Sequence, residues 1–214
     1  MSSKFIDFVK VGSKIVCVGR NYATHAKELG NALPTAPILF TKPTTCYVND
    51  GGIIRYPSIS SDLHYEVELG VIIGEKASQV SEDKIMNHVA GYTIAVDVTC
   101  RDIQEQCKKE RIPWTMAKCL DTFCPVGNFV SSSEIDPFNT ELVLKLNNEL
   151  KQHGNTKDMI FSVPSLLEYI NRHITLLPGD VILTGTPEGV GPLSRGDEIH
   201  VAIPNVTEAT FHVE

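Results

Sequence analysis

The sequence predicts an α+β protein that is mainly β, with a few short helices. Short apolar runs rich in valine and isoleucine recur along the whole chain, separated by glycine, proline, asparagine or serine, which is the pattern of strands joined by turns. Segments with helical spacing are fewer and shorter. The 214 residues are 42% hydrophobic and 21% charged, which is typical of a globular protein. We therefore expect a single domain spanning residues 1–214.

Strands are expected wherever branched or aromatic residues lie between turn residues. They cover residues 15–18, 38–40, 66–73, 90–96, 126–130, 142–146, 181–184, 198–203 and 209–213. After the segment 142–146, Asn147 and Asn148 predict a tight hairpin, because asparagine tolerates the positive φ that such turns require. Helices are expected at residues 23–29, 82–86, 102–109 and 164–171. Ser162, with Pro164 just behind it, is a typical helix start.

Two glutamates one residue apart in an apolar segment are the most informative feature of the chain. On a strand, Glu66 and Glu68 project from the same face, and Asp97 ends a second predicted strand. Adjacent carboxylates repel one another unless a positive charge lies between them, and carboxylate oxygens are the ligands that Mg²⁺ or Mn²⁺ prefers. A Glu-x-Glu pair is also common on the solvated face of a strand without any metal, so Asp97 is what favours the metal site.

Further polar residues follow the predicted metal ligands. Arg101 and Gln104 come directly after Asp97, and Lys118 lies in a largely apolar segment. A half-buried lysine can bind an anion or stabilise an oxyanion, although a lysine that exposes its amine and packs only its stem explains the pattern equally well. A glycine-rich segment that contains Thr186 follows the predicted strand 181–184. Its glycines permit a close approach of the backbone to a small ligand.

His25 and Glu28 are three residues apart, so on a helical turn they would be neighbours on one face. A carboxylate beside an imidazole raises its basicity, and such a pair could deprotonate a water molecule. The alternative is an exposed pair of little energetic value, and the spacing alone favours that alternative.

Charge and hydropathy exclude several classes of protein. A net charge of -7, with one short basic run at residues 108–111, argues against nucleic-acid binding. Apolar runs fall short of the roughly 18 to 20 residues that a membrane span needs, and the sequence shows no secretion signal. The 6 cysteines lack metal or disulfide spacing, so we expect reduced, packed thiols in an intracellular protein. A mitochondrial address within residues 1–14 is an open alternative.

Taken in order, several motifs resemble one known family. They are Gly19-Arg-Asn-Tyr-Ala-x-His25-x-x-Glu28, Phe40-Thr-Lys42-Pro43, His64-Tyr-Glu66-Val-Glu68-Leu69, Asp97-x-x-x-Arg101-Asp102-x-Gln104, Lys118, and Gly185-Thr186-Pro187-x-Gly-Val-Gly191. Each motif alone is weak, but the combination is specific. Over nearly its whole length the chain resembles the fumarylacetoacetate hydrolase superfamily.

This resemblance implies a mixed β-roll like the C-terminal domain of fumarylacetoacetate hydrolase, usually assembled as a homodimer. It implies that Mg²⁺, or alternatively Mn²⁺, is held by Glu66, Glu68 and Asp97. The catalytic residues that it implies are His25, Glu28 and Lys118, the first two as a dyad on a lid that activates water. The substrate-binding residues that it implies are Arg20, Lys42, Arg101, Gln104 and Thr186.

The activities implied are hydrolysis of acylpyruvates by carbon–carbon cleavage, decarboxylation of oxaloacetate, and enol–keto tautomerisation of oxaloacetate. All three pass through the enolate of a 2-oxoacid, which a metal ion would stabilise. The expected partners are therefore small 2-oxoacid substrates, and the expected location is the mitochondrial matrix, with the cytosol as the alternative. Two other functions stay open: an enzyme for larger dioxoacids of aromatic degradation, and a metal-binding regulator without turnover.

Overall fold

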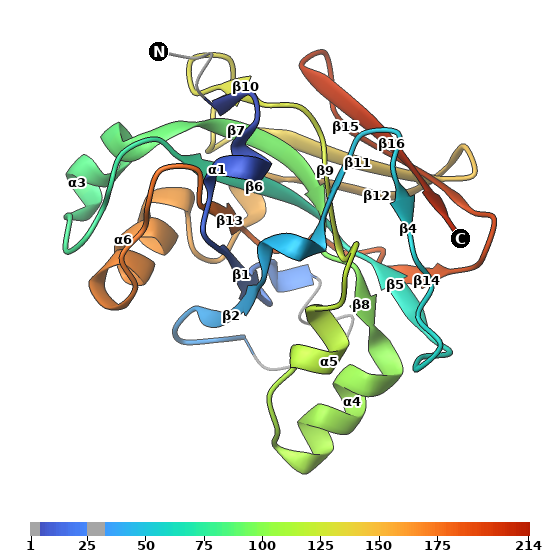
Figure 1. The fold of residues 1–214 in the computed structure, drawn as a ribbon. Coiled ribbons are helices and arrows are strands. Elements are labelled where there is room, and N and C mark those ends of the chain that lie inside the picture. The colour runs from blue at the N-terminus through green and yellow to red at the C-terminus, as the bar shows by residue number, and fades with distance from the viewer. Residues whose placement is uncertain (1–4, 25–32) are drawn as a thin grey trace.

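Strands outnumber helices in the computed structural model, which describes residues 5–24 and 33–214 (Figure 1). The expected α+β class with mainly β structure is therefore confirmed. The strands are β1 (Ile15–Gly19), β2 (Ile38–Lys42), β3 (Tyr47–Asn49), β4 (Ile53–Ile54), β5 (Leu63–Tyr65), β6 (Val67–Ile73), β7 (Val89–Val96), β8 (Thr99–Cys100), β9 (Cys124–Val126), β10 (Val130–Ser131), β11 (Glu141–Leu146), β12 (Glu149–Asn155), β13 (Val181–Leu183), β14 (Gly191–Leu193), β15 (Glu198–Ile203) and β16 (Thr207–Val213). The helices are α1 (Phe8–Val11), α3 (Glu82–Ile85), α4 (Arg101–Glu110), α5 (Thr115–Lys118) and α6 (Val163–His173), with 3₁₀ turns at Thr44–Cys46, Met86–His88 and Thr156–Asp158.

The largest sheet places β6 and β7 side by side near its centre. Its order is β2-β1-β13-β6-β7-β9-β3, and β10 also pairs with β7. β1 is parallel to β13 and β3 is parallel to β9, whereas the pairs β1–β2, β13–β6, β6–β7 and β7–β9 are antiparallel. Every residue of β6 is buried, and all but one of β7, so both faces of the sheet are covered at its centre.

Two smaller sheets complete the β structure. One has the order β12-β11-β15-β16-β4, and the other has the order β14-β5-β8. The second sheet continues directly from the centre of the large one, because β5 leads into β6 and β7 leads into β8. The β5–β6 connection and the β7–β8 connection therefore both join the same two sheets. Residues at these two connections form part of the site described below.

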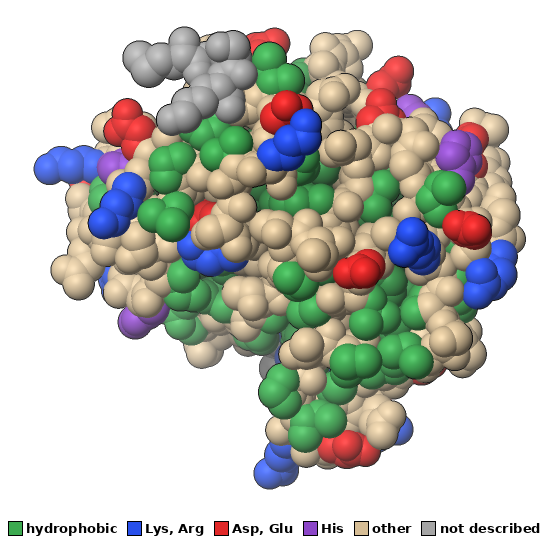
Figure 2. Space-filling view, in the orientation of Figure 1, with side chains coloured by type: hydrophobic (Ala, Val, Ile, Leu, Met, Phe, Trp, Pro, Cys, Tyr) green, Lys and Arg blue, Asp and Glu red, His purple; other side chains and the backbone are tan. Residues whose placement is uncertain are grey.

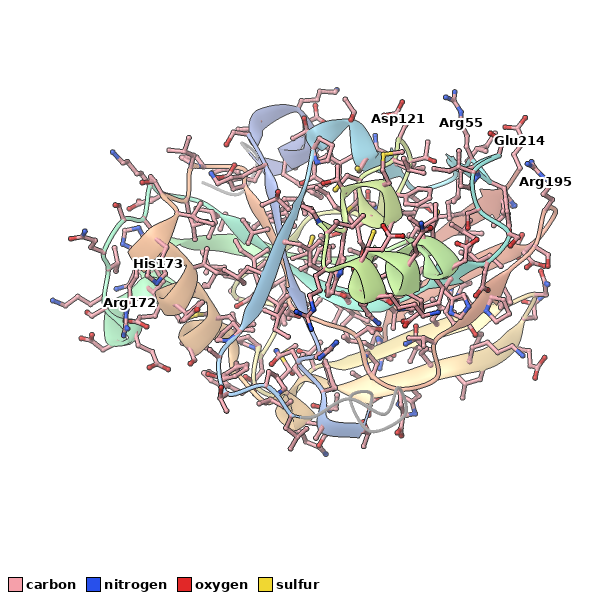
Figure 3. The ribbon with its side chains drawn as sticks, turned by 90° about the horizontal axis from the view of Figure 1, so that it is seen from below. Arg55, Asp121, Arg172, His173, Arg195 and Glu214 are labelled. Atoms are coloured by element: carbon pink, nitrogen blue, oxygen red, sulfur yellow. The ribbon has the colours of Figure 1, made fainter. Side chains whose placement is uncertain are left out.

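The helices other than α1 lie at two ends of the molecule (Figure 1). α3 and α6 contact each other beside one end of the large sheet, while α4 and α5 contact each other and protrude at the other end (Figure 1). Basic and acidic side chains are interspersed on the face shown in Figure 2. Figure 3 shows Arg172 on α6 at one end of the molecule and Arg55 and Arg195 at the opposite end. In the part of the chain that the structure describes, the helices are all too short or too polar to span a membrane.

Most of the expected strands are confirmed, namely those at 15–18, 38–40, 90–96, 142–146, 198–203 and 209–213, while the segments 66–73 and 181–184 each lose one terminal residue. The strand expected at residues 126–130 is wrong, because the chain is paired only up to Val126 and again from Val130. The break begins at Gly127, whose N–H donates to the carbonyl of Ile94 at 2.8 Å and where a Cβ would lie 2.8 Å from the Ile94 side chain.

The hairpin at Asn147 and Asn148 is confirmed, with φ values of 51° and 66°. The helices expected at 82–86, 102–109 and 164–171 are also present as α3, α4 and α6, with bounds that differ by a few residues. Most of the helix expected at 23–29 lies outside the described residues. The cysteines are all free, and all of them except Cys119 are buried, in line with the expected packing.

Candidate active site

Glu66, Glu68 and Asp97 are brought together by the pairing of β6 with β7. Val67 pairs with Val96, so Glu66 and Asp97 lie one residue beyond this pair, and the N–H of Asp97 donates to the carbonyl of Glu66 at 2.8 Å. Glu68 follows within β6. The three side chains are 6%, 2% and 1% exposed, and each offers an oxygen within 4.8 Å of the others. The sequence therefore predicted this cluster correctly, although Glu66 lies just before the strand.

Lys118, the last residue of α5, lies against the carboxylates. Its Nζ donates to Asp97 Oδ2 at 2.5 Å, to Glu66 Oε2 at 2.9 Å and to Thr99 Oγ1 at 2.6 Å. The side chain is 2% exposed, and the amine also lies 5.1 Å from the ring centre of Phe40. These contacts engage all three ammonium protons. Lys118 is thus a buried charge within the cluster, and its amine does not reach the surface.

Arg101 and Gln104 approach the cluster from the first turns of α4. They are three residues apart on the buried face of the helix. Arg101 Nη2 donates to Glu66 Oε1, and Nη1 donates to Gln104 Oε1 at 2.6 Å. Because its oxygen is occupied in this way, Gln104 offers its amide N–H groups to a ligand.

Lys42, the last residue of β2, also contacts the cluster. Its Nζ lies 2.8 Å from Asp97 Oδ1, and the side chain is almost fully buried. The same amine donates to the backbone carbonyls of Phe123 at 2.9 Å and Val98 at 3.2 Å, and to that of Lys118. In this position Lys42 neutralises and orients Asp97.

Burial raises the pKa of Glu68 well above its ordinary value, and the charges of Asp97 and Glu66 act in the same direction. Two groups oppose this rise: the N–H of Gly185, which donates to Glu68 Oε2 at 2.6 Å, and the more distant Lys118. A cation placed between the carboxylates would favour the ionised form of all three.

The loop after β13, whose Gly185 N–H donates to Glu68, also passes very close to Asn21. At Gly185, φ is 97°, and a Cβ would lie 2.7 Å from the Asn21 side chain. Asn21 is fully buried, and its amide Nδ2 donates to the carbonyl of Thr184 at 2.8 Å. The glycine-rich segment therefore approaches the site with its backbone, as the sequence indicated.

One small cavity, of about 30 Å³, connects these groups. Its walls are Val18, Gly19, Arg20, Phe40, Glu66, Glu68, Asp97, Arg101, Gln104, Lys108, Trp114, Lys118 and Thr186. Arg20 follows β1 with a φ of 60°. The rings of Phe40 and Trp114 lie edge to face at 5.7 Å between centres. The cavity thus has carboxylates at one wall, cations around them and an aromatic side.

The structure brings most of the predicted site residues together. Those that line the cavity are Arg20, Glu66, Glu68, Asp97, Arg101, Gln104, Lys118 and Thr186. Lys42 contacts Asp97 from behind and is not among the residues that line this cavity. His25 and Glu28 lie outside the described residues.

Sequence reasoning missed several site residues. Phe40 and Trp114 could have been noticed as aromatic residues beside predicted site residues. Gln152 could not, because a glutamine between Lys151 and His153 on a strand is typical of a solvated face. It is nevertheless 1% exposed and donates to Thr186 Oγ1 at 2.9 Å.

The donor set of the cluster fits a hard divalent cation. Three buried carboxylates with oxygens within 4.8 Å of one another match the oxygen ligands of Mg²⁺ or Mn²⁺, whereas zinc prefers sites with nitrogen or sulfur ligands.

Comparison with known proteins gives a consistent result. Residues 14–214 match the model of the fumarylacetoacetate (FAA) hydrolase C-terminal family. The chain belongs to this family. The fumarylacetoacetate hydrolase family thus accounts for nearly the whole chain, and the expected β-roll fold is confirmed.

Relatives within the family have related names. The mitochondrial oxaloacetate tautomerase FAHD1 of Arabidopsis thaliana is 51% identical over 96% of this chain and 92% of its own length. The mitochondrial oxaloacetate decarboxylase of Dictyostelium discoideum is 48% identical over 96% of each chain. The names of these family members confirm the expected mitochondrial location.

A solved family structure shows the same fold with small ligands. The fumarylpyruvate hydrolase of Pseudomonas aeruginosa, in complex with Mn²⁺ and pyruvate, is 34% identical and has a TM-score of 0.89. The match covers 94% of this chain and 88% of that protein. Members of the fumarylacetoacetate hydrolase family that share this fold therefore include a protein that binds a divalent metal and a 2-oxoacid.

Proposed function

We propose that this protein is a metal-dependent enzyme of 2-oxoacid chemistry, acting on oxaloacetate as a tautomerase and decarboxylase and on acylpyruvates as a hydrolase. The observation that carries the proposal is the buried cluster of Glu66, Glu68 and Asp97, which shares one cavity with Lys118 and Arg101. The names of the Arabidopsis and Dictyostelium relatives support oxaloacetate as substrate. The Pseudomonas complex with Mn²⁺ and pyruvate supports a divalent metal and a pyruvate-like ligand.

The charges of the site favour a dianionic substrate. The carboxylates of Glu66, Glu68 and Asp97 are balanced by three cations, Lys42, Lys118 and Arg101. A divalent cation held by the carboxylates, Mg²⁺ or Mn²⁺, would make the site positive, and oxaloacetate carries two carboxylates. Such complementarity strengthens binding and discriminates against neutral ketones.

Each polar group around the cavity then has a separate part in binding. A bound metal would withdraw electrons from the 2-oxo group and so lower the energy of the enolate. Arg20 supplies a cation, and Gln104 offers the N–H groups that its contact with Arg101 leaves free. Thr186, which also lines the cavity, supplies a hydroxyl. Lys42, which we expected to contact substrate, supports the site through Asp97.

Lys118 is placed to move a proton. In tautomerisation, one proton leaves the carbon between the two carbonyl groups and one joins the 2-oxo oxygen. The Lys118 ammonium is within 3 Å of Asp97 and Glu66. After it gives a proton to the substrate oxygen, its neutral amine can take up the proton that leaves the carbon. In decarboxylation the electron pair left by carbon dioxide forms the same enolate, which is then protonated at carbon to give pyruvate.

Hydrolysis of an acylpyruvate additionally requires water. Water adds to the distal carbonyl, the carbon–carbon bond breaks, and the products are a carboxylic acid and the enolate of pyruvate. We assign the activation of this water to His25 and Glu28. Tautomerisation and decarboxylation need no water attack, so they depend less on this dyad.

We also propose that the protein is a homodimer. Hydrophobic side chains gather at the surface over α4 and α5 (Figure 2), and Ile112 and Met116 there are 48% and 53% exposed. A partner subunit that covered this region would bury apolar surface that otherwise faces water. Light scattering coupled to gel filtration gives the mass directly.

One ultraviolet assay tests the proposed activities. Acetylpyruvate, enol-oxaloacetate and keto-oxaloacetate are supplied side by side, with Mg²⁺ and with a chelator. We expect metal-dependent enol–keto interconversion, slower loss of carbon dioxide, and formation of pyruvate from acetylpyruvate. Full activity in chelator would refute the role of the metal. Silence on all three substrates, with metal bound, would favour the alternatives of a larger dioxoacid substrate or a regulator without turnover.

A further inference from the structure

Gln152 is a buried polar residue from a different sheet that reaches the site. It belongs to β12, at the edge of the five-stranded sheet, and is 1% exposed, unlike its neighbour His153, whose side chain is 55% exposed. Burial of an amide without partners is unfavourable by several kcal/mol, in the range of about 2 to 7. The hydrogen-bond partners of the Gln152 amide therefore indicate the role of this side chain.

The amide of Gln152 is bonded at both ends. Its Oε1 accepts from the N–H of Val67 at 2.9 Å. Its Nε2 donates to Thr186 Oγ1 at 2.9 Å, to the carbonyl of Pro187 at 3.0 Å and, at the longer distance of 3.5 Å, to that of Glu188. A backbone N–H can only donate and a carbonyl can only accept, so these partners fix which end of the amide is oxygen and which is nitrogen.

This orientation determines what the Thr186 hydroxyl can do. Because Nε2 of Gln152 donates, Thr186 Oγ1 must accept, and its own proton is left for another acceptor. Thr186 lines the cavity together with Glu66 and Glu68. A hydroxyl fixed in this way presents a hydrogen-bond donor to an anionic oxygen in the cavity.

The same amide connects two walls of the cavity. Val67, which donates to it, lies between Glu66 and Glu68, and Thr186 and Pro187 belong to the loop whose Gly185 N–H binds Glu68. That loop packs tightly on β12. A Cβ at Gly189 would lie 2.3 Å from the carbonyl of Lys151, and a Cβ at Gly154 would lie 2.4 Å from the Pro187 ring.

We propose that Gln152 is a positioning residue, which holds the Thr186 hydroxyl as a donor to the carboxylate or enolate oxygen of the substrate. The proposal rests on the proposed 2-oxoacid function for the identity of that oxygen. It further assigns to the five-stranded sheet an indirect part in recognition: among the described residues none of β12 lines the cavity, and Gln152 acts through Thr186, which does.

The test compares Gln152→Glu, Thr186→Val and the double variant. The Gln152→Glu change keeps the shape but replaces the donor by an acceptor, so the Thr186 proton would turn from the cavity to the new carboxylate. Gln152→Met removes both the donor to Thr186 and the acceptor for the Val67 N–H without adding a charge. It serves as a second variant should the first fail to fold. Gln79→Glu is the matched control, because Gln79 is exposed. Thr186→Ser keeps the hydroxyl.

Two readouts are measured: pyruvate affinity in the presence of Mn²⁺ by calorimetry, and kcat and KM for oxaloacetate tautomerisation. We expect Gln152→Glu and Thr186→Val each to lower pyruvate affinity or kcat/KM by about 10- to 100-fold, as for loss of one hydrogen bond to a charged group. The double variant should be no worse than the poorer single variant by more than about threefold, because both changes remove one interaction. Gln79→Glu should behave like the wild type, and Thr186→Ser, which retains the hydroxyl, should lose less affinity and turnover than Thr186→Val.

Full affinity and turnover in both Gln152 variants would overturn the proposal, as would losses that multiply in the double variant. If the wild type binds pyruvate but turns over no 2-oxoacid, the proposed activity fails, and the calorimetry alone decides the role of Gln152. A wild type that neither binds pyruvate nor turns over oxaloacetate would overturn both.

Discussion

Lys42 Nζ lies 2.8 Å from Asp97 Oδ1, and both side chains are buried. The lysine also binds the carbonyls of Val98 and Phe123, so a single ammonium joins the end of β2 to the chain on either side of α4 and α5. Asp97 keeps its other oxygen for Lys118, at 2.5 Å. The pair therefore links the stability of the fold to the geometry of the site.

Replacing Lys42 by methionine should strongly destabilise the protein. The substitution leaves Asp97 as a buried carboxylate with one cation fewer and leaves the bound carbonyls without their donor. Breaking a buried ion pair from one side lowers the free energy of unfolding by about 3 to 5 kcal/mol. Urea unfolding followed by circular dichroism measures this change.

The matched control is Lys10→Met. Lys10 forms an exposed pair with Asp7, with side chains 72% and 69% exposed, and such pairs contribute about 0 to 1 kcal/mol. Equal effects of the two substitutions would mean that the Lys42–Asp97 pair contributes no more than a surface pair.

Glu68→Ala and His25→Ala should separate the proposed activities. Glu68 is placed among the metal ligands, so its loss should reduce hydrolysis, decarboxylation and tautomerisation alike, to near background. His25→Ala should reduce acetylpyruvate hydrolysis most, because only that reaction needs an activated water. The rates of all three reactions are measured on each variant, with Glu75→Ala, an exposed glutamate just after β6, as control. Equal residual hydrolysis in the two variants would contradict this division of roles.

The fold was largely predictable where one segment carried its own signal. The Asn147–Asn148 turn and strands such as β7 and β15 follow from local residue types and spacing. Strands β4, β8 and β14, of two or three residues each, are too short to show any period. The interruption begins where Gly127 packs closely against Ile94, a contact between residues distant in sequence.

The site residues likewise include some that the local sequence predicts and others that only tertiary contacts place. Glu66, Glu68 and Asp97 were predictable because carboxylates in apolar strands are unusual and point to a partner. The sequence left two interpretations of Lys118 open, and only the packing of α5 against β8 decides that its amine is buried. The family resemblance implied that Lys42 binds the substrate, whereas the contacts that the structure gives Lys42 are with Asp97 and backbone carbonyls. Both outcomes depend on tertiary contacts that no local pattern contains.

Asp180 provides a pH-dependent contribution to stability, far from the proposed metal ligands in sequence. Burial alone would raise its pKa, but hydrogen bonds from the Lys14 side chain, the N–H of Leu177, and the N–H and hydroxyl of Ser13 outweigh burial and lower it. Its Oδ1 accepts from Ser13 N and Oγ at 2.8 Å each, and its Oδ2 accepts from Leu177 N at 2.8 Å. The carboxylate thereby attaches the segment before β1 to the segment before β13.

Because the pKa of Asp180 is lower in the folded state than in the unfolded state, its contribution is complete above the unfolded value, about 3.9. The contribution is lost as the pH falls through the lower folded value. Asp180→Asn should therefore reduce the free energy of unfolding by about 1 to 3 kcal/mol at neutral pH, and the difference from wild type should shrink below about pH 4. Urea unfolding at several pH values between neutral and acid measures the difference. Asp121→Asn is the control, since Asp121 is exposed at the edge of the molecule (Figure 3). If the loss of unfolding free energy in Asp180→Asn stayed constant with pH, the ionised carboxylate would not be the group that stabilises this junction.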